Sequence, residues 1–442
     1  MLLTVIAVLM LLSCTCGENP AIQVTLTNKG LQYGKHEATD WVQKNLEDVT
    51  LPDITGEIDI SVLGSIDYTL TGIIKCDLPE PSVEFYPDAT GFKTSMLGLS
   101  VALSGEWMTH YGIIHDGGSF DMAVFSVSVS SVVELGKYAD GHLSVNSVSC
   151  DAQVGDVDME FHGGARYSKK VREKDTEICP YVKKMIVNLD YHLQAMNVSF
   201  DVDQALTLDL SLTDFPFIDV SRLNLGFKGE FYSIKTHVDP PFEAQPFTMP
   251  EQQGYMLSMG LSEFTLNSAS YGFYSAGGFQ VLINNSMIPP GSPVHLNTSL
   301  MGPFIPQLPK MFPGLLMDLQ VYATEVPMFS FQPDAVKVDF QVAVKAFAIQ
   351  PNGTQTPLFK LNVVSNFSFL TDALEIMAKM GINFALAKVN QKLGKGFDLP
   401  RMKHAQLVNS VLKMQEGFVA LFSDAEVLLT DRRFNRQRDG PV

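Results

Sequence analysis

The chain has 442 residues, which is long enough for two domains with hydrophobic cores. Its 46% hydrophobic and 18% charged content excludes wholesale disorder. The net charge of −17 is uneven: residues 1–238 contain 16 Lys+Arg against 32 Asp+Glu, a net of −16, which leaves −1 for residues 239–442. So acidic a first half argues against nucleic acid as a general partner.

The first 17 residues read as a secretory signal peptide. Residues 2–12 form an apolar run too short to span a bilayer, and small residues follow up to Gly17. A lipidated Cys14 is the alternative interpretation. No later stretch is apolar enough to cross a membrane, so we expect a secreted, extracellular protein.

Cleavage after Gly17 would leave three cysteines: Cys76, Cys150 and Cys179. In an oxidising compartment two of them should pair, leaving one over. Five N-x-S/T sequons, typical of a secreted glycoprotein, occur at Asn197, Asn284, Asn297, Asn352 and Asn366.

Residues 27–47 are predicted to form a helix, because apolar and small residues recur at steps of three and four. This face comprises Leu31, Gly34, Ala38, Trp41, Val42 and Val49. Two interpretations stay open: the stripe packs on a sheet, or its small residues leave room for an acyl chain.

Alternating strands follow, beginning with Ile58–Val62 and Ile66–Leu70. Phe120, Met122 and Val124 keep one phase, and Phe125 starts the other, which predicts a β-bulge. The cleanest alternation runs over Leu206–Leu212. Strands of this kind without βαβ spacing indicate an antiparallel, strongly twisted sheet.

Between the strands, residues 179–196 read as a helix. The preceding run from Arg166 to Lys174 contains five basic residues. A solvated surface is one interpretation of that cluster, and a lipid-headgroup contact is the other.

A proline-rich stretch, residues 238–250, should be extended and stiff. We interpret it as a spacer between related halves. The expected domains are residues 18–237, a linker at 238–254, a second domain at 255–430 and a polar tail at 431–442.

The second half repeats the pattern of strands and helices. Residues 256–261 are strand-like, and Ser262 should cap a helix that runs to about Ser275. One long strand is predicted over Val336–Val344. Another helix should begin at Thr371 or Asp372 and end near Gly394.

The sequence contains no recognisable catalytic or metal-binding constellation. There is no H-E-x-x-H, no phosphate-binding loop and no dinucleotide fingerprint, and Gly98–Ala102 lacks the second glycine of a nucleophile elbow. We therefore expect neither an enzyme nor a bound metal or cofactor, although a hydrolase with dispersed catalytic residues is the rival class. Two apolar halves suit a binder of apolar ligands.

Several segments, in this order, carry a resemblance to a known family. They are Glu18–Gly34, Leu51–Ile54, Cys150 with Cys179, Lys228–Tyr232, Phe304–Gln307, Phe331–Pro333 and Gly396–Pro400. The chain resembles the bactericidal permeability-increasing protein and lipopolysaccharide-binding protein family, within the tubular lipid-binding proteins. The resemblance implies an α+β fold in which two barrels of strongly twisted antiparallel sheet with helices are joined by a central sheet, as a boomerang. It also implies a Cys150–Cys179 disulfide.

The resemblance further implies an apolar pocket for phospholipid acyl chains beneath each barrel. Leu31, Gly34, Ala38 and Val42 would border the first pocket, and Phe264, Asn267, Ser268 and Tyr271 the second. The expected function is innate antibacterial defence, with lipopolysaccharide or phospholipid as ligand and the bacterial outer membrane as a candidate surface. Bound phospholipid is expected.

The chain departs from the family at the tip of the first barrel. Residues 105–116 contain no Lys or Arg, whereas members that bind lipopolysaccharide have a basic loop there. Candidate headgroup contacts are Trp107, His110, Tyr111, Arg166, Lys169 and Lys170. The alternative function is therefore a phospholipid carrier without lipopolysaccharide activity. The stretch between Cys150 and Cys179, and the strands after Phe369, are also shorter than expected.

Overall fold

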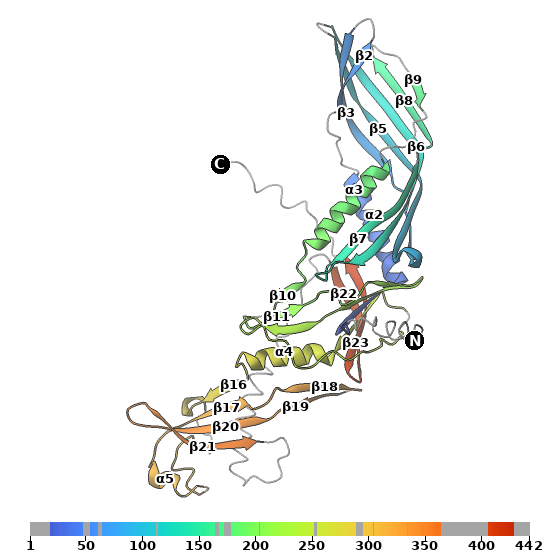
Figure 1. The fold of residues 1–442 in the computed structure, drawn as a ribbon. Helices are drawn as coiled ribbons and strands as arrows, with labels where there is room; N and C mark the ends of the chain where they lie inside the picture. The colour runs from blue at the N-terminus through green and yellow to red at the C-terminus, as the bar shows by residue number, and fades with distance from the viewer. Residues whose placement is uncertain are drawn as a thin grey trace, which may run out of the picture.

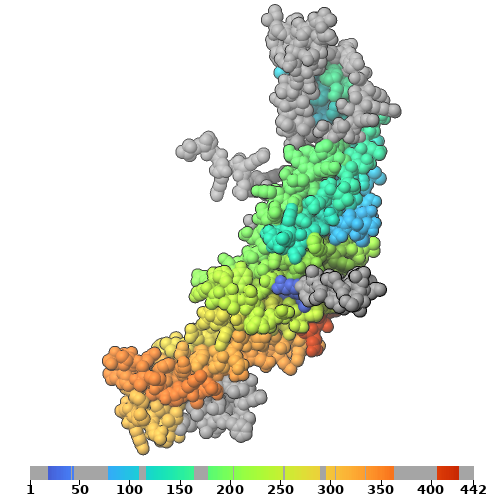
Figure 2. Space-filling model, in the orientation of Figure 1, coloured from blue at the N-terminus to red at the C-terminus, as the bar shows by residue number. Residues whose placement is uncertain are grey.

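The structure is a computed structural model that describes most of the chain. The described residues are 18–46, 54–60, 64–111, 114–163, 168–171, 178–202, 204–251, 254–288, 295–303, 305–333, 335–363 and 405–427. The signal peptide, the helix predicted at 371–394, the polar tail, Arg166 and Asn366 lie outside these ranges. The molecule is elongated and curved (Figure 1). In Figure 2 the first described residues (blue) and the last ones (red) both lie near the middle of its length.

One end, called here the first lobe, is a large sheet with two helices, α2 (Asn28–Leu46) and α3 (Ile178–Gln194). The sheet has the order β2-β3-β5-β6-β8-β9, with β4 paired to β5 and β7 to β6. Its strands are β2 (Ile54–Ile60), β3 (Gly64–Asp77), β4 (Ser82–Tyr86), β5 (Gly91–Tyr111), β6 (Ile114–Lys137), β7 (Leu143–Gln153), β8 (Asp156–Gly163) and β9 (Ser168–Val171), with the short helix η1 (Pro87–Ala89) after β4.

The middle is a six-stranded sheet built from distant parts of the chain. In spatial order it contains β12 (Phe217–Ile218), β13 (Arg222–Phe227), β1 (Ile22–Thr27), β15 (Leu257–Ser262), β23 (Phe418–Val427) and β22 (Ala405–Gln415). A smaller sheet beside it contains β10 (Ser199–Asp201), β11 (Leu206–Asp209) and β14 (Glu230–Ser233). Both ends of the described chain therefore meet in one sheet.

The other end, the second lobe, begins with α4 (Glu263–Ser275). It contains a four-stranded sheet, a two-stranded hairpin and two short helices. These are β16 (Gln280–Ile283), β17 (Met317–Ala323), β20 (Val342–Ile349) and β21 (Gln355–Val363); β18 (Met328–Gln332) and β19 (Ala335–Asp339); and η2 (Asn285–Met287) and α5 (Leu308–Met311). Every pairing between the described strands is antiparallel, so the α+β class is confirmed.

The predicted bulge in β6 is confirmed. Leu99 pairs with Val127 and Val101 with Val124, so Phe125 and Ser126 together face a single residue of β5. Ser126 takes a positive φ of 57°. The bulge reverses the strand's faces, because Phe120 and Val127 are both buried although seven positions separate them.

Two predicted strands are corrected. The long strand at Val336–Val344 is wrong: β19 ends at Asp339, β20 begins at Val342, and the two belong to different sheets. The alternation at Leu206–Leu212 also gives only a short strand, since β11 ends at Asp209 and Leu212 makes an isolated bridge to Phe227. Alternation shows which face is apolar, but not where a strand changes its partner.

The predicted helices that lie in the described ranges are confirmed. The helix expected at 27–47 is α2, and the one at 179–196 is α3. Ser262 caps α4 as expected, its hydroxyl accepting a hydrogen bond from the Phe264 N–H.

Each lobe has its own hydrophobic core. The first-lobe core joins Phe85, Leu135 and Val145 of the large sheet to Ile218 and Leu223 of the central sheet. Leu31 of α2 and Ile186 and Leu193 of α3 pack against it. The second-lobe core centres on β17 and β20 and includes Leu296, Met317, Leu319, Val344 and Ala346.

Candidate functional site

Helix α2 starts at the central sheet and is held there by the last described strand. The Lys29 ammonium donates to the Asp424 carboxylate at 2.8 Å and to the Gly254 carbonyl at 2.7 Å. The Val427 N–H donates to the Tyr33 hydroxyl at 3.1 Å. The N-terminal turns of α2 are therefore fixed in position by β23, which is almost 400 residues away in the sequence.

Beyond this anchor, the small-residue face of α2 meets little protein. Leu31 packs against the first-lobe core. A Cβ added at Gly34 would meet nothing within 4 Å, and Ala38 is exposed. Val42, one turn further on, is half-buried. The face predicted to border the first pocket thus passes from the core into open space.

Two further side chains of α2 bind β4 and the segment before it. Lys35 pairs with Glu80 at 2.9 Å, and this hydrogen bond lowers the pKa of Glu80. Gln32 donates to the Val83 carbonyl at 2.8 Å. These contacts fix the rotation of the helix about its axis and so fix which way Gly34 faces.

In α4, the polar residues predicted for the second pocket bind neighbouring strands. The Asn267 side chain donates to the Phe329 carbonyl at 2.9 Å and accepts from the Phe329 N–H at 2.6 Å. The Ser268 hydroxyl accepts from the Phe231 N–H at 3.0 Å and donates to the Thr265 carbonyl. Asn267 and Ser268 therefore attach α4 to β18 and β14.

The two aromatic residues predicted for the second pocket contact the proline-rich segment. Phe264 and Tyr271 lie edge-on to Phe242, with ring centroids 5.9 and 6.2 Å away. Further along this segment, Phe247 stacks on Phe418 at 4.7 Å. Residues 238–251 form neither helix nor strand, as expected of an extended segment, but they pack against the central sheet and α4.

A buried ion pair beside this region was missed by sequence reasoning. The Lys228 ammonium lies 2.7 Å from the Glu230 carboxylate, which is only 4% exposed. Burial raises the pKa of Glu230, although Lys228 opposes the shift. Burial disfavours the Lys228 charge, yet Glu230 and two further carboxylates outweigh it and raise its pKa. The sequence did contain an indication of this ion pair, because both residues belong to the Lys228–Tyr232 segment on which the family resemblance was based.

At the distal end of the first lobe, β5 and β6 form a long hairpin. Trp107 is 5% exposed, and its indole N–H donates to the His162 carbonyl at 3.2 Å. His110 and Tyr111 end β5, where His110 pairs with His115 of β6. On β9, Lys169 and Lys170 pair with Met159 and Asp158 of β8. The predicted headgroup residues that are described thus belong to two strands of one sheet, β5 and β9.

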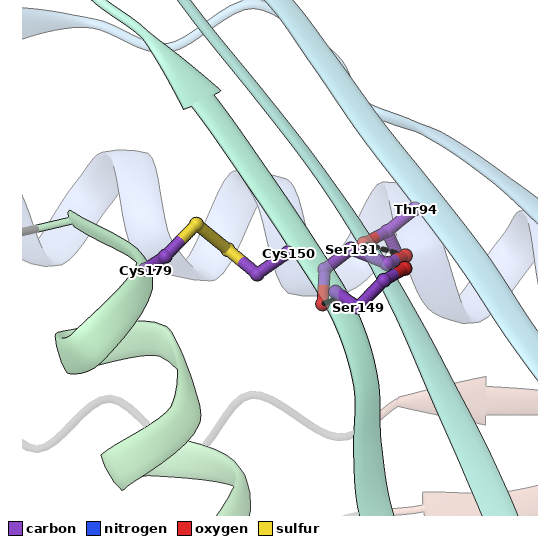
Figure 3. Close-up of a disulfide and its surroundings, with 5 residues drawn as sticks. All are labelled: Thr94, Ser131, Ser149, Cys150 and Cys179. Atoms are coloured by element: carbon purple, nitrogen blue, oxygen red, sulfur yellow. Dashed lines mark hydrogen bonds between the residues drawn. A yellow bond between two sulfur atoms is a disulfide. The ribbon is translucent and has the colours of Figure 1, made fainter.

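The disulfide implied by the resemblance is present. Cys150 on β7 and Cys179 in the first turn of α3 are joined by an S–S bond of 2.05 Å, with Cα atoms 5.7 Å apart (Figure 3). Beside it, the Ser131 hydroxyl donates to the Ser149 carbonyl at 3.3 Å. The bond fixes the start of α3 to the edge strand β7.

Four of the five sequons lie in described segments. Asn197 follows α3 and is exposed, and Asn352 occupies an exposed turn in which its side chain accepts from Thr354. Asn284 and Asn297 are half-buried in the second lobe. Their glycosylation stays a prediction.

Within the described ranges, no three His, Cys, Asp or Glu side chains lie close enough together to hold a metal ion. Among the same residues, no helix is both long and apolar enough to cross a bilayer. The candidate site residues instead form an apolar face on α2 and, on α4, polar side chains that bind the backbone of neighbouring strands.

Comparison with known proteins identifies the class. The model of the LBP / BPI / CETP family N-terminal domain matches residues 30–189, and that of the C-terminal domain matches residues 200–373. A bactericidal permeability-increasing protein from Sebastes schlegelii is 32% identical over 95% of this chain and 98% of its own length. Human lipopolysaccharide-binding protein is 27% identical over 93% and 95%.

A crystal structure of lipopolysaccharide binding protein covers 93% of this chain with a TM-score of 0.50 at 22% identity, which supports the boomerang fold. The fold and the matches define a non-enzymatic lipid-binding protein. The chain belongs to the LBP / BPI / CETP family, with both of that family's domains.

Proposed function

We propose that this is a secreted lipid-binding protein of innate antibacterial defence. It would take the acyl chains of lipopolysaccharide or phospholipid into an apolar pocket beneath each of two barrels. The observation that carries the proposal is the face of α2, where Leu31 reaches the core while Gly34 and Ala38 adjoin open space. Each methylene removed from water there contributes about 0.8 kcal/mol, so acyl chains bind with few polar contacts.

The proposal of a second pocket is supported by fewer contacts. Asn267 and Ser268 are engaged with strands, so in this proposal they position α4. Phe264 and Tyr271, which contact Phe242, would supply the apolar lining. Exchange of Phe242 for a lipid chain would make the proline-rich segment part of this pocket.

The alternative, a phospholipid carrier without lipopolysaccharide activity, is favoured by the tip of the first lobe. Residues 105–116 include Glu106 and Asp116 but no Lys or Arg, in a half of the chain with a net charge of −16. Lipid A phosphates would meet repulsion there, and His110 and His115 would carry charge only in acid. Arg166, Lys169 and Lys170 are the remaining candidates for headgroup contact.

The test is to purify the secreted protein, extract its lipid, and titrate it with lipopolysaccharide and with phosphatidylcholine. We expect copurifying phospholipid and binding of at least one of the two. Gly34→Phe, which fills the open space beside α2, should reduce lipid content. The control Ala335→Phe, at an exposed position on β19 of the second lobe, should not. A protein that carries no lipid and binds neither ligand would end the proposal.

A further inference from the structure

Two lysines face each other across the outer side of the four-stranded sheet in the second lobe. Lys345 of β20 lies directly opposite Lys360 of β21, and both residues are exposed. The second-lobe core, which includes Leu319, Val344 and Ala346, lies on the other side of this sheet, because successive residues of a strand point to opposite faces. Like charges directly opposite each other destabilise a sheet, so the pair requires a compensating interaction.

Within the described chain the two lysines share one partner, an aromatic ring. The Lys345 ammonium lies 5.1 Å from the centroid of the Tyr322 ring, and the Lys360 ammonium lies 5.8 Å from the same centroid. The face of a ring attracts a cation, but the ring has no net charge. Tyr322 therefore brings the two ammonium groups together without neutralising either of them.

The carboxylate nearest to this pair in sequence along the sheet is directed elsewhere. Asp318 is the only acidic residue in β16, β17, β20 and β21. It is 6% exposed and accepts a hydrogen bond from the neutral Gln355 amide at 2.7 Å. Lys345 lies opposite Gln320, midway between Asp318 and Tyr322, so by contacting the Tyr322 ring it leans away from Asp318. Two uncompensated positive charges are thus exposed at one place on the sheet.

We propose that Lys345, Lys360 and Tyr322 form a binding site for a phosphate group, either free phosphate or the phosphomonoester of a lipid headgroup. Such a group carries nearly two negative charges at pH 7, so a single group neutralises both lysines. It also has enough oxygens to accept a separate hydrogen bond from each ammonium. A carboxylate, with one charge, would leave one lysine uncompensated.

The surroundings of the lysine pair support this assignment. Asn362 is exposed and lies two residues beyond Lys360 on the same side of β21, where its amide can donate to a further phosphate oxygen. Ala343, between Tyr322 and Asn362 in the register of the sheet, is fully buried, so the longer side chains around it cover it. The site lies on the side of the sheet opposite the core and does not depend on the proposed acyl pockets.

Isothermal titration calorimetry of the secreted protein with inorganic phosphate tests the site, with sodium chloride of equal ionic strength as the blank. We expect binding at millimolar phosphate. Because each lysine supplies a hydrogen bond to a charged group, Lys345→Gln or Lys360→Gln should weaken binding about tenfold or more, and the double variant should abolish it. The matched control Lys235→Gln/Lys337→Gln makes the same change in net charge at two exposed lysines outside this sheet and should bind like the wild type.

Thermal denaturation shows that the variants are folded and gives an independent measurement. Without phosphate, Lys345→Gln should be at least as stable as the wild type, because it removes the repulsion between the two lysines. Added phosphate should raise the melting temperature of the wild type and of the matched control, but not that of the double variant. Tyr322→Leu should also lose this response, because its lysines are no longer held together.

Vesicles distinguish free phosphate from a lipid headgroup. Phosphatidic acid has a phosphomonoester headgroup, and phosphatidylcholine vesicles without it are the control. Sedimentation with phosphatidic acid vesicles that is lost in Lys345→Gln/Lys360→Gln would assign the site to a lipid headgroup, and calorimetric binding without sedimentation would assign it to free phosphate.

A wild-type protein that binds neither inorganic phosphate nor these vesicles, or a double variant that binds them like the wild type, would overturn the site. Copurifying phospholipid reports the acyl pockets and should be the same in all variants. A protein that carries phospholipid but shows no phosphate binding would therefore overturn this site and leave the proposed function standing.

Discussion

Two glycines in α2 have opposite surroundings, although four positions separate them. A Cβ at Gly30 would lie 2.5 Å from the Met256 carbonyl oxygen, whereas one at Gly34 would meet nothing. Neither residue has a positive φ. The difference therefore tests packing alone, without backbone strain.

Gly30→Ala should lower the free energy of unfolding by about 1–3 kcal/mol, because a backbone atom must move to admit the methyl group. Gly34→Ala, its matched control, should raise the free energy of unfolding by up to about 1 kcal/mol through helix propensity. Chemical denaturation of the two variants checks both values. Equal effects would contradict the close approach of α2 to Met256.

Asn267 binds the backbone of Phe329 through both halves of its amide. Asn267→Ala removes the side-chain partner of the half-buried N–H and carbonyl of Phe329, so we expect a loss of about 1–3 kcal/mol in unfolding free energy. Asn188→Ala, on the exposed side of α3, should change stability by less than about 0.5 kcal/mol. A small effect at Asn267 would show that β18 is held by other contacts.

At the scale of elements, α3 is attached at both ends. Its first turn is fixed by the disulfide, and the residues just after its last turn are held by His142, whose Nε2 lies 2.8 Å from the Met196 carbonyl. Between these points Asp190 binds β7. The helix can therefore present apolar side chains to solvent without depending on them for its position.

The disulfide closes a loop with a sequence separation of 29, for which chain entropy predicts about 3–4 kcal/mol of stabilisation. Cys150→Ala should therefore lower secretion and unfolding free energy markedly. Cys76→Ala, which leaves this bond intact, should do little. Secretion yields and denaturation midpoints measured side by side decide the matter, and equal losses would contradict the assigned pairing.

His142 should make stability depend on pH. Its Nδ1 lies 2.9 Å from the Asp140 carboxylate, and the interaction with this carboxylate raises the pKa of His142. A raised folded pKa adds stability that is complete below about pH 6.5 and is lost as pH rises through the folded pKa. The stability advantage of wild type over His142→Gln should therefore be larger at pH 5.5 than at pH 8.5.

Asp140→Asn should remove most of this pH dependence, since it removes the main cause of the shift. His192→Gln, an exposed position on α3, is the matched control and should retain it. Denaturation curves at the two pH values suffice. A pH-independent difference between wild type and His142→Gln would refute the assignment.

Elements that depend on the spacing of residues within one segment were predictable from the sequence. Features that depend on which distant strand or side chain a segment pairs with were not. The helix from Asn28 and the bulge at Ser126 follow from spacing within one segment. The break after Asp339 could not be predicted, because both sides of it alternate in the same way. At Asn267 a small polar side chain fits either a ligand pocket or a bond to a strand, and only the fold shows the bond.

On the scale of the whole molecule, the central sheet joins both lobes. The strand β1 lies between β13 and β15, and β15 pairs with β23, so strands near the two ends of the chain are separated by one strand. Helix α2 leaves this sheet toward one lobe, and α4 leaves it toward the other. A substitution that destabilises the central sheet should therefore also destabilise both lobes.

Phe422 tests this coupling. It is 1% exposed on β23, where it packs with Phe418 and Tyr255. Phe422→Ala should cost about 3–5 kcal/mol and speed hydrogen exchange in both α2 and α4, because each helix begins at a strand of the damaged sheet.

The matched comparison is Phe120→Ala, an equally apolar deletion that is buried within the first lobe against Phe161. It should speed exchange in the first-lobe strands while α4 keeps its protection, because no strand of the central sheet is altered. Mass-spectrometric exchange on peptides covering α2, α4 and β6 distinguishes the two patterns. If Phe422→Ala left α2 protected, the lobes would be energetically independent, and the anchor at Lys29 and Asp424 would be a surface contact without a structural role.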